Sequence, residues 1–188
     1  ATLLKTRKNP SLILARELPI ELALSPSAYG VQMVAKSSLA VKKDHRIEQL
    51  SSSDADQIYA LARRTQPGPF ASRTHELGDY IGIKLEGRLI AMAGQRARLP
   101  GLTEISAVCV DRRYRRQGLG TAVVKHMAAH VIENADHPFL HTYADNKAAI
   151  SLYEKIGFRI RTGGKLLRLD PDALCAFEPT PLAQANTV

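Results

Sequence analysis

The chain has no tryptophan, and phenylalanine and tyrosine bring its aromatic content to only 5%. Proteins that bind single-stranded nucleic acid stack bases on aromatic side chains, so this scarcity argues against an RNA-binding role. The chain has only two cysteines, Cys109 and Cys175, and no Cys-x-x-Cys or Cys/His ligand spacing. The sequence therefore supports neither a zinc site nor a disulfide framework, and we expect no metal.

Long hydrophobic runs are also missing. The longest early apolar stretch, residues 12–24, is interrupted by Arg16, Glu17, Pro19 and Glu21. It is too short and too polar to span a bilayer and lacks the shape of a signal peptide. We expect a cytoplasmic protein with no membrane partner.

The charge that is present is mainly positive. The 188 residues carry a formal net charge of +8, which favours an anionic partner without saying which one. Four arginines fall within residues 111–120, next to Gly118 and Gly120. This clustering indicates a local anion site rather than the broad basic face of a nucleic-acid binder, so we expect no nucleic-acid partner.

Hydrophobic periodicity predicts a mixed fold. We expect strands over residues 45–50, 80–85, 89–95, 103–110 and 139–143, and helices over residues 54–65, 121–134 and 146–156. A final hairpin is predicted over residues 158–169, turning at residues 162–164, and a short helix over residues 29–36. This order predicts an α/β (α+β) domain over residues 45–170, an N-terminal appendage over residues 1–44 and a C-terminal tail over residues 171–188.

The most informative turn has the pattern R-x-x-G-x-G, formed by Arg115, Gly118 and Gly120. It follows an apolar strand and opens directly into a helix. The first N–H groups of a helix lack internal partners and carry partial positive charge, so such a turn can bind phosphate. Taken alone, the turn also fits a solvated arginine loop. It matches neither the dinucleotide-binding Rossmann pattern nor the Walker pattern.

A second pattern, N-x-x-A-x-x-x-Y-x-x-x-G-F, runs from Asn146 through Tyr153 to Phe158. Together, in this order and each after a strand, the two patterns resemble the signatures of the GNAT superfamily of acetyltransferases. The resemblance covers residues 46–169, and residues 67–70 with 73–78 look like those of a bacterial branch of unknown acceptor specificity. One departure is the sequence Val110-Asp111-Arg112, where many relatives have V-x-P.

The resemblance implies a mostly antiparallel sheet, flanked by helices, with a V-shaped splay between two central parallel strands. Acetyl-CoA would be the co-substrate, its pantetheine arm in the splay and its diphosphate on the turn. The implied cofactor-binding residues are Val108, Cys109, Val110, Arg115, Arg116, Gln117, Gly118, Leu119, Gly120, Thr121 and Asn146.

By the same resemblance, Tyr153 is the general acid that protonates the leaving thiolate, and Glu104 is a candidate for the base. His75 and Glu76 are candidates for acceptor binding, and a buried, hydrogen-bonded His141 is expected on its strand. The implied reaction is direct acetyl transfer to a primary amine of a small molecule or a protein.

Other functions stay open at this point. One is another acyl donor or an alcohol acceptor, and another is a non-catalytic acyl-CoA-binding regulatory module. A homodimer is a further expectation, with the appendage and the final hairpin as its candidate elements.

Overall fold

The computed structural model describes residues 13–15, 23–36, 39 and 43–169. The chain divides into two compact units. One comprises Ala1–Tyr29 with Gly164–Val188, and the other comprises Gly30–Gly163. In the first unit, β1 (Ile13–Ala15) pairs antiparallel with the end of β8 (Phe158–Leu169). The predicted domain boundaries at residues 44 and 170 stay predictions.

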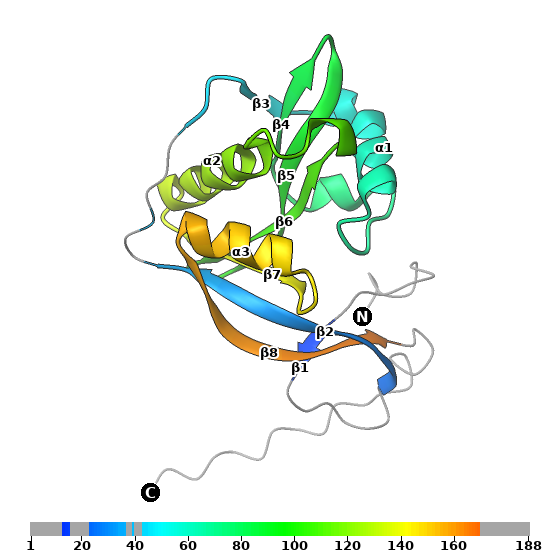
Figure 1. Cartoon of the computed structure of the whole chain (residues 1–188), viewed down its shortest axis with the longest axis vertical. Helices are drawn as coiled ribbons and strands as arrows, with labels where there is room; N and C mark the ends of the chain where they lie inside the picture. Colours follow the sequence, from blue (N-terminus) through cyan, green and yellow to red (C-terminus); the bar gives the residue numbers. More distant parts are fainter. Residues whose placement is uncertain (1–12, 16–22, 37–38, 40–42, 170–188) are drawn as a thin grey trace, which may run out of the picture. The chain divides into compact units, whose positions relative to one another are not determined.

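The unit Gly30–Gly163 is built on a sheet with the strand order β8-β2-β7-β6-β5-β4-β3 (Figure 1). Its strands are β2 (Ala23–Ala35), β3 (Ile47–Leu50), β4 (Tyr80–Leu85), β5 (Arg88–Leu99), β6 (Leu102–Val110), β7 (His137–Tyr143) and β8. The helices are α1 (Ala55–Thr65), α2 (Leu119–Glu133) and α3 (Lys147–Ile156), with 3-10 turns η2 (Ser52–Asp54), η3 (Thr74–Leu77) and η4 (Arg112–Tyr114).

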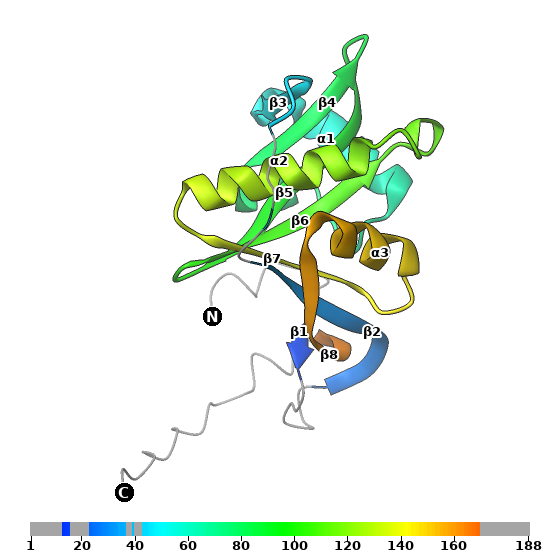
Figure 2. The same cartoon turned by 60° about the vertical axis from the view of Figure 1, so that its left-hand side comes forward.

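Helices cover both faces of this sheet, and alternation along the strands explains why. Ala91 and Ala93 of β5 join a core with the apolar side chains of α2 and α3. Met92, between them, joins a second core with Ile58 and Leu61 of α1. Figure 2 shows α2 and α3 lying across the sheet. The mixed, mostly antiparallel sheet flanked by helices is confirmed.

The central strands β6 and β7 are parallel, and their pairing is short. It extends from Leu102↔His137 to Ile105↔Leu140. Beyond Ile105 the register of β6 against β5 slips by one residue, from Gly94↔Ser106 to Met92↔Cys109. Ala107, within this bulge, adopts a left-handed φ of 50°. A bulge bends its strand, so the carboxyl half of β6 diverges from β7, as the predicted splay requires.

Two predicted elements are wrong. Residues 29–35 of the predicted helix belong to β2, and Lys36 follows the strand, because Met33 and Ala35 alternate into the core while β2 pairs along β7. Residues 158–169 form the single strand β8 instead of a hairpin. The glycines at 163 and 164 do not turn the chain: neither has a positive φ, and a Cβ on Gly163 would meet the Gly30 carbonyl oxygen at 3.5 Å.

Candidate active site

The turn between β6 and α2 presents free backbone donors. Arg116 and Gly118 have left-handed φ values of 62° and 76°, and no side chain caps α2. Ala122 is the first residue whose N–H bonds back, to the Gly118 carbonyl at 3.0 Å. The N–H groups of Leu119, Gly120 and Thr121 therefore precede the helical ladder, as in a helix N-terminus that binds an anion. A Cβ on Gly118 would meet nothing within 4 Å, so the approach is open.

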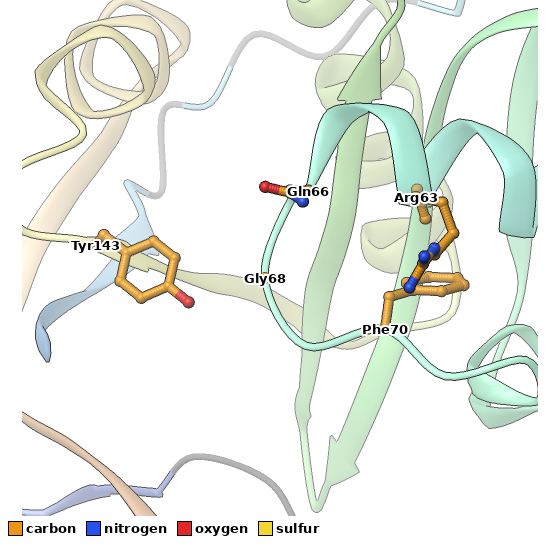
Figure 3. Close-up of a pocket in the computed structure, with 6 residues that line it drawn as sticks. Arg63, Gln66, Gly68, Phe70 and Tyr143 are labelled. Carbon is orange, nitrogen blue, oxygen red and sulfur yellow. The ribbon is translucent and has the colours of Figure 1, made fainter. Parts of the chain in front are cut away.

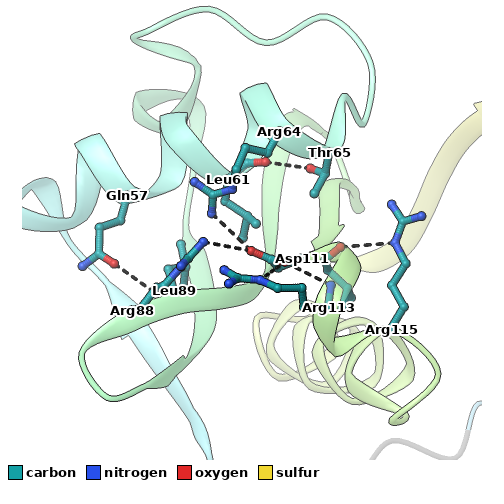
Figure 4. A network of polar contacts seen from close by, with 10 residues as sticks. Gln57, Leu61, Arg64, Thr65, Arg88, Leu89, Asp111, Arg113 and Arg115 are labelled. Carbon is teal, nitrogen blue, oxygen red and sulfur yellow. Dashed lines mark hydrogen bonds and ion pairs between the residues drawn. The ribbon is translucent and has the colours of Figure 1, made fainter.

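Asp111 organises the base of this turn (Figure 4). Its carboxylate accepts a hydrogen bond from the Arg113 N–H at 3.1 Å and one from the Arg88 Nη2 at 3.2 Å, and it lies 3.6 Å from the Arg64 Nη2. The N–H of Arg113 and then the neighbouring guanidinium groups lower the pKa of the carboxyl despite its burial. Asp111 therefore contacts three arginines and fixes the start of the turn.

The diverging half of β6 carries the residues expected to line the gap. Val108 and Val110 are half-buried and pack against the core shared with α2 and α3. Cys109 points to the other face and packs in the core with α1. Burial raises the pKa of its thiol to about 12, so Cys109 is not a nucleophile at neutral pH.

Helix α3 supplies Asn146 and Tyr153. The Asn146 side chain caps the helix by accepting the Ala149 N–H at 3.1 Å. The Tyr153 ring is buried and packs edge-on against Phe158, with centroids 6.3 Å apart. Burial raises the pKa of its phenol to about 12. Tyr153 therefore stays protonated at neutral pH, as a proton donor must.

Glu104 lies on the sheet face that α1 also covers, and it is only 3% exposed. Arg96 of β5 holds both of its carboxylate oxygens, at 2.6 and 3.0 Å, and the His141 Nδ1 lies 2.8 Å from Oε1. Burial raises the pKa of Glu104, but the hydrogen bonds from His141 and Arg96 outweigh it and the net pKa is lowered. Glu104 is thus a fixed anion, held between Arg96 and His141.

The hydrogen bonds and ion pairs of the acceptor candidates His75 and Glu76 do not reach Arg96, Glu104 or His141. His75 Nδ1 lies 3.0 Å from the Ser72 carbonyl oxygen, within their own loop. Glu76 is exposed and forms a two-pronged ion pair with Arg73. Their acceptor-binding role stays a prediction.

A pocket of about 410 Å³ opens between the end of α1 and β7 (Figure 3). Its walls combine polar and aromatic groups: Ala62, Arg63, Gln66, Gly68, Phe70 and Tyr143. Tyr143 lies two residues from His141, so both side chains stand on one sheet face. Sequence reasoning missed Tyr143, because the pocket forms only where strand and loop meet.

The residues that the structure describes contain no group of three or more His, Cys, Asp or Glu side chains that could hold a metal ion. Within the same residues, no helix is both long enough and apolar enough to cross a membrane.

Comparisons with known proteins give a consistent picture. Residues 80–165 match the model of the FR47-like protein family. The [ribosomal protein bS18]-alanine N-acetyltransferase of Escherichia coli K12 is 30% identical over 122 residues, covering 62% of this chain and 82% of that enzyme. A GNAT-family acetyltransferase structure from Novosphingobium aromaticivorans has a TM-score of 0.72 and 36% identity, covering 85% of this chain and 67% of that one.

This chain belongs to the GNAT superfamily of N-acetyltransferases. A further relative, the N-alpha-acetyltransferase of Sulfurisphaera tokodaii, is 27% identical, covering 62% of this chain and 81% of that protein. The GNAT fold accounts for the parallel pair β6–β7 and for the turn that precedes α2. The chain is accordingly an acetyltransferase enzyme.

The Asp111 cluster of this GNAT domain makes a testable contribution to stability. Replacing Asp111 with Asn removes the charge that three arginines share, and we expect the free energy of unfolding at pH 7 to fall by about 1–2 kcal/mol. Because the folded pKa of Asp111 is lowered, this loss of stability should be complete above the unfolded pKa and should vanish as the pH falls through the folded pKa. Urea denaturation of both proteins at several pH values measures the difference in their free energies of unfolding.

The matched control is Glu133→Gln, which breaks an exposed ion pair with Lys43. Exposed pairs contribute little, so this variant should unfold like the wild type. Equal stability of Asp111→Asn and wild type at pH 7 would contradict the role given to Asp111.

Proposed function

We propose that this GNAT enzyme transfers an acetyl group from acetyl-CoA directly to a primary amine, and that the amine is the N-terminus of a protein. The observation that carries the proposal is the uncapped N-terminus of α2 beside a gap between two parallel strands, with Tyr153 on the helix that follows.

The turn fits a diphosphate in charge and in shape. The N–H groups from Arg116 to Thr121 would hold it, and the exposed side chains of Arg115 and Arg116 would neutralise charge that the helix dipole leaves. The N–H and C=O groups of Val108 and Val110 would pair with the amides of the pantetheine arm, which lies along β6 like an added strand. Asn146 keeps its amide NH₂ as a donor toward that arm while its oxygen caps α3.

Acetyl-CoA supplies an activated acyl group as a thioester. The residues of this chain then act on protons and charge. A strand N–H near Val108 would stabilise negative charge on the acyl oxygen, and the Tyr153 hydroxyl would protonate the departing thiolate. Cys109 takes no part as a nucleophile, because it is buried and points away from the gap. The transfer therefore needs no covalent enzyme intermediate.

Two considerations support a protein N-terminus as acceptor. Two relatives are named as a [ribosomal protein bS18]-alanine N-acetyltransferase and an N-alpha-acetyltransferase. In addition, only a neutral amine attacks, and an α-amine with a pKa near 8 is roughly a quarter neutral at pH 7.5, against about one in a thousand for lysine. The pocket beside Tyr143 gives such a peptide end both polar and aromatic contacts.

The preferred acceptor can be identified by measuring the rate at which free CoA thiol is released from acetyl-CoA. A panel of short peptides with free N-termini should release CoA from acetyl-CoA at least tenfold faster, in kcat/KM, than the same peptides blocked at the N-terminus and carrying one lysine. Free polyamines serve as the small-molecule comparison. Faster turnover with lysine peptides or polyamines would overturn the N-terminal assignment.

Cofactor binding should stabilise the fold. Acetyl-CoA at about 100 times its Kd should raise the Tm by about 5 °C or more, because it binds only the folded state. Gly118→Trp should abolish this shift by filling the space in front of α2. The control, Gly87→Trp, replaces another left-handed glycine with open space around it, in the β4–β5 turn, and should keep the shift. A full shift in Gly118→Trp would place the anion elsewhere.

Removing the Tyr153 hydroxyl should separate chemistry from binding. We expect Tyr153→Phe to lower kcat by about 10²-fold and to leave acetyl-CoA affinity within about twofold, since the ring and its packing on Phe158 remain. Because the pKa of Tyr153 is raised to about 12, wild-type kcat should show no loss attributable to this group up to about pH 10. Unchanged kcat in the variant would remove Tyr153 as the acid.

A further inference from the structure

Two neighbouring arginines in the last turn of α1 have different surroundings. Arg64 lies 3.6 Å from the Asp111 carboxylate and belongs to the cluster at the base of the turn before α2. Arg63 instead lines the pocket beside Tyr143. Its side chain is exposed, and it forms no ion pair or hydrogen bond with the other residues that the structure describes. The positive charge of Arg63 is therefore available to a ligand in the pocket.

The pocket lining has the chemistry of a site for a small anionic group. Of the six described lining residues, Arg63 is the charged one. Gln66 and Tyr143 add an amide and a hydroxyl, and Phe70 adds an aromatic wall. In Figure 3 the Tyr143 hydroxyl points toward the loop that carries Gln66 and Gly68. An arginine with polar groups and an aromatic ring around it suits a short polar ligand that carries a negative charge.

The backbone at Gln66 is a second sign of a built site. Gln66 ends α1 in the left-handed conformation, with a φ of 50°, and its N–H donates to the Ala62 carbonyl at 2.8 Å. Glycine is the usual residue at such a helix end, because a residue with a Cβ is strained there. Strained residues of this kind are concentrated at ligand sites. Here the strained residue contributes an amide side chain to the pocket lining.

The loop that follows is held by its own contacts. Pro67 restricts its backbone at the point where it leaves α1. The Thr74 Oγ1 accepts a hydrogen bond from the Ala71 N–H at 2.8 Å. The Phe70 ring packs edge-on against Tyr80, with centroids 6.4 Å apart. The wall of the pocket is therefore formed before a ligand binds, which lowers the entropy cost of binding.

We propose that Arg63 makes the pocket selective for protein N-termini that carry a carboxylate side chain, Asp or Glu, on the first or second residue. This inference rests on the proposed function and narrows its acceptor class. A volume of about 410 Å³ is at the small end of ligand pockets, so it accommodates only the first residues of a peptide.

The guanidinium group determines the sign of the preference. Arginine presents two parallel N–H donors that match the two oxygens of a carboxylate. A lysine or arginine side chain in the same place would be repelled by Arg63. Gln66 and Tyr143 have no charge, so they would bond the peptide amides whatever the side chain. The charge of the acceptor side chain therefore acts through Arg63.

The first test compares short peptides that are identical except at the second residue, which is Glu, Gln or Lys. We expect kcat/KM with acetyl-CoA to be about tenfold higher for Glu than for Gln, and lower again for Lys. The difference should lie mainly in KM, because the ion pair does not involve the reacting atoms. A Glu at the first residue should also be preferred over Gln, and a Glu at the fifth should not. Equal kcat/KM for Glu and Gln at both of the first two residues would overturn the proposal.

The second test changes the charge of the arginine. Arg63→Glu should reverse the order, so that the Lys peptide becomes the best acceptor, while the acetyl-CoA Tm shift is retained. The control is Arg98→Gln, which also removes one exposed positive charge. Arg98 pairs with Thr103 near the start of β6, whereas Tyr143 is the last residue of β7, at the far end of the parallel pair. The control should keep the preference for Glu. An Arg63→Glu enzyme that still prefers the Glu peptide would refute the role of Arg63.

Salt provides a readout that needs no variant. Raising NaCl from about 50 to about 500 mM should increase KM for the Glu peptide severalfold, because salt screens an exposed ion pair. KM for the Gln peptide should change little. The same salt dependence for both peptides would contradict an ion pair in the complex.

Failure of the proposed function gives a different pattern. Protein that binds acetyl-CoA but acetylates none of the peptides would refute N-terminal acetylation and the preference with it. Faster turnover of free glutamate or aspartate than of every peptide would also refute the peptide acceptor. Turnover of the peptides without regard to the charge of their first two residues would refute the role of Arg63 alone.

Discussion

The end of pairing between β6 and β7 is the constraint on which the rest of the site depends. Four residue pairs hold these parallel strands together, and the bulge at Ala107 then turns β6 away. Backbone groups of Val108 and Val110 are thereby freed from the neighbouring strand. Buried backbone groups need partners, so a gap of this kind is stable only if a ligand strand or water can pair with it. The gap thus leaves backbone groups of the sheet to which an amide-bearing chain can hydrogen-bond.

Two further groups of residues act because of where that gap lies. At its outer end, Asp111 holds three arginines and sets the direction in which the chain enters α2. At its inner end, Glu104 is still within the paired half of β6, and this keeps it beside Phe139 and close to His141. The proposed anion site and the Glu104–His141 pair therefore lie at opposite ends of one diverging strand. The carboxyl half of β6 therefore spans the distance between these two sites.

Local patterns predicted most of this fold. The α2 and α3 helices, the β4–β5 hairpin and the turn at Gly118 follow from hydrophobic period and glycine position, which act over a few residues. The two errors have one cause. Within the unit Gly30–Gly163, β8 and β2 are neighbouring strands although they are far apart in the sequence, and this long-range pairing overrode the local helix and turn signals.

The site divides in the same way. Its proposed cofactor side lies in two contiguous patterns, so the sequence alone was enough to propose it. The hydrogen bonds through His141 could not be predicted, because they link side chains from four strands: Arg96, Glu104, His141 and Gln32. A histidine in an apolar strand looks like a core residue until its cross-strand neighbours are known, so His141 was expected only as a buried, hydrogen-bonded residue.

The left-handed backbone of Ala107 has an evolutionary consequence. An alanine there carries a steric cost of about 1 kcal/mol that glycine would relieve, yet glycine would let the bulge relax into other shapes. Selection for thermostability alone would favour removing the extra residue and straightening the ladder. A strained, methyl-bearing residue at this point is the kind of feature that a trade-off between stability and activity would leave in a protein. Laboratory evolution toward higher stability would be expected to erode the enzyme here first.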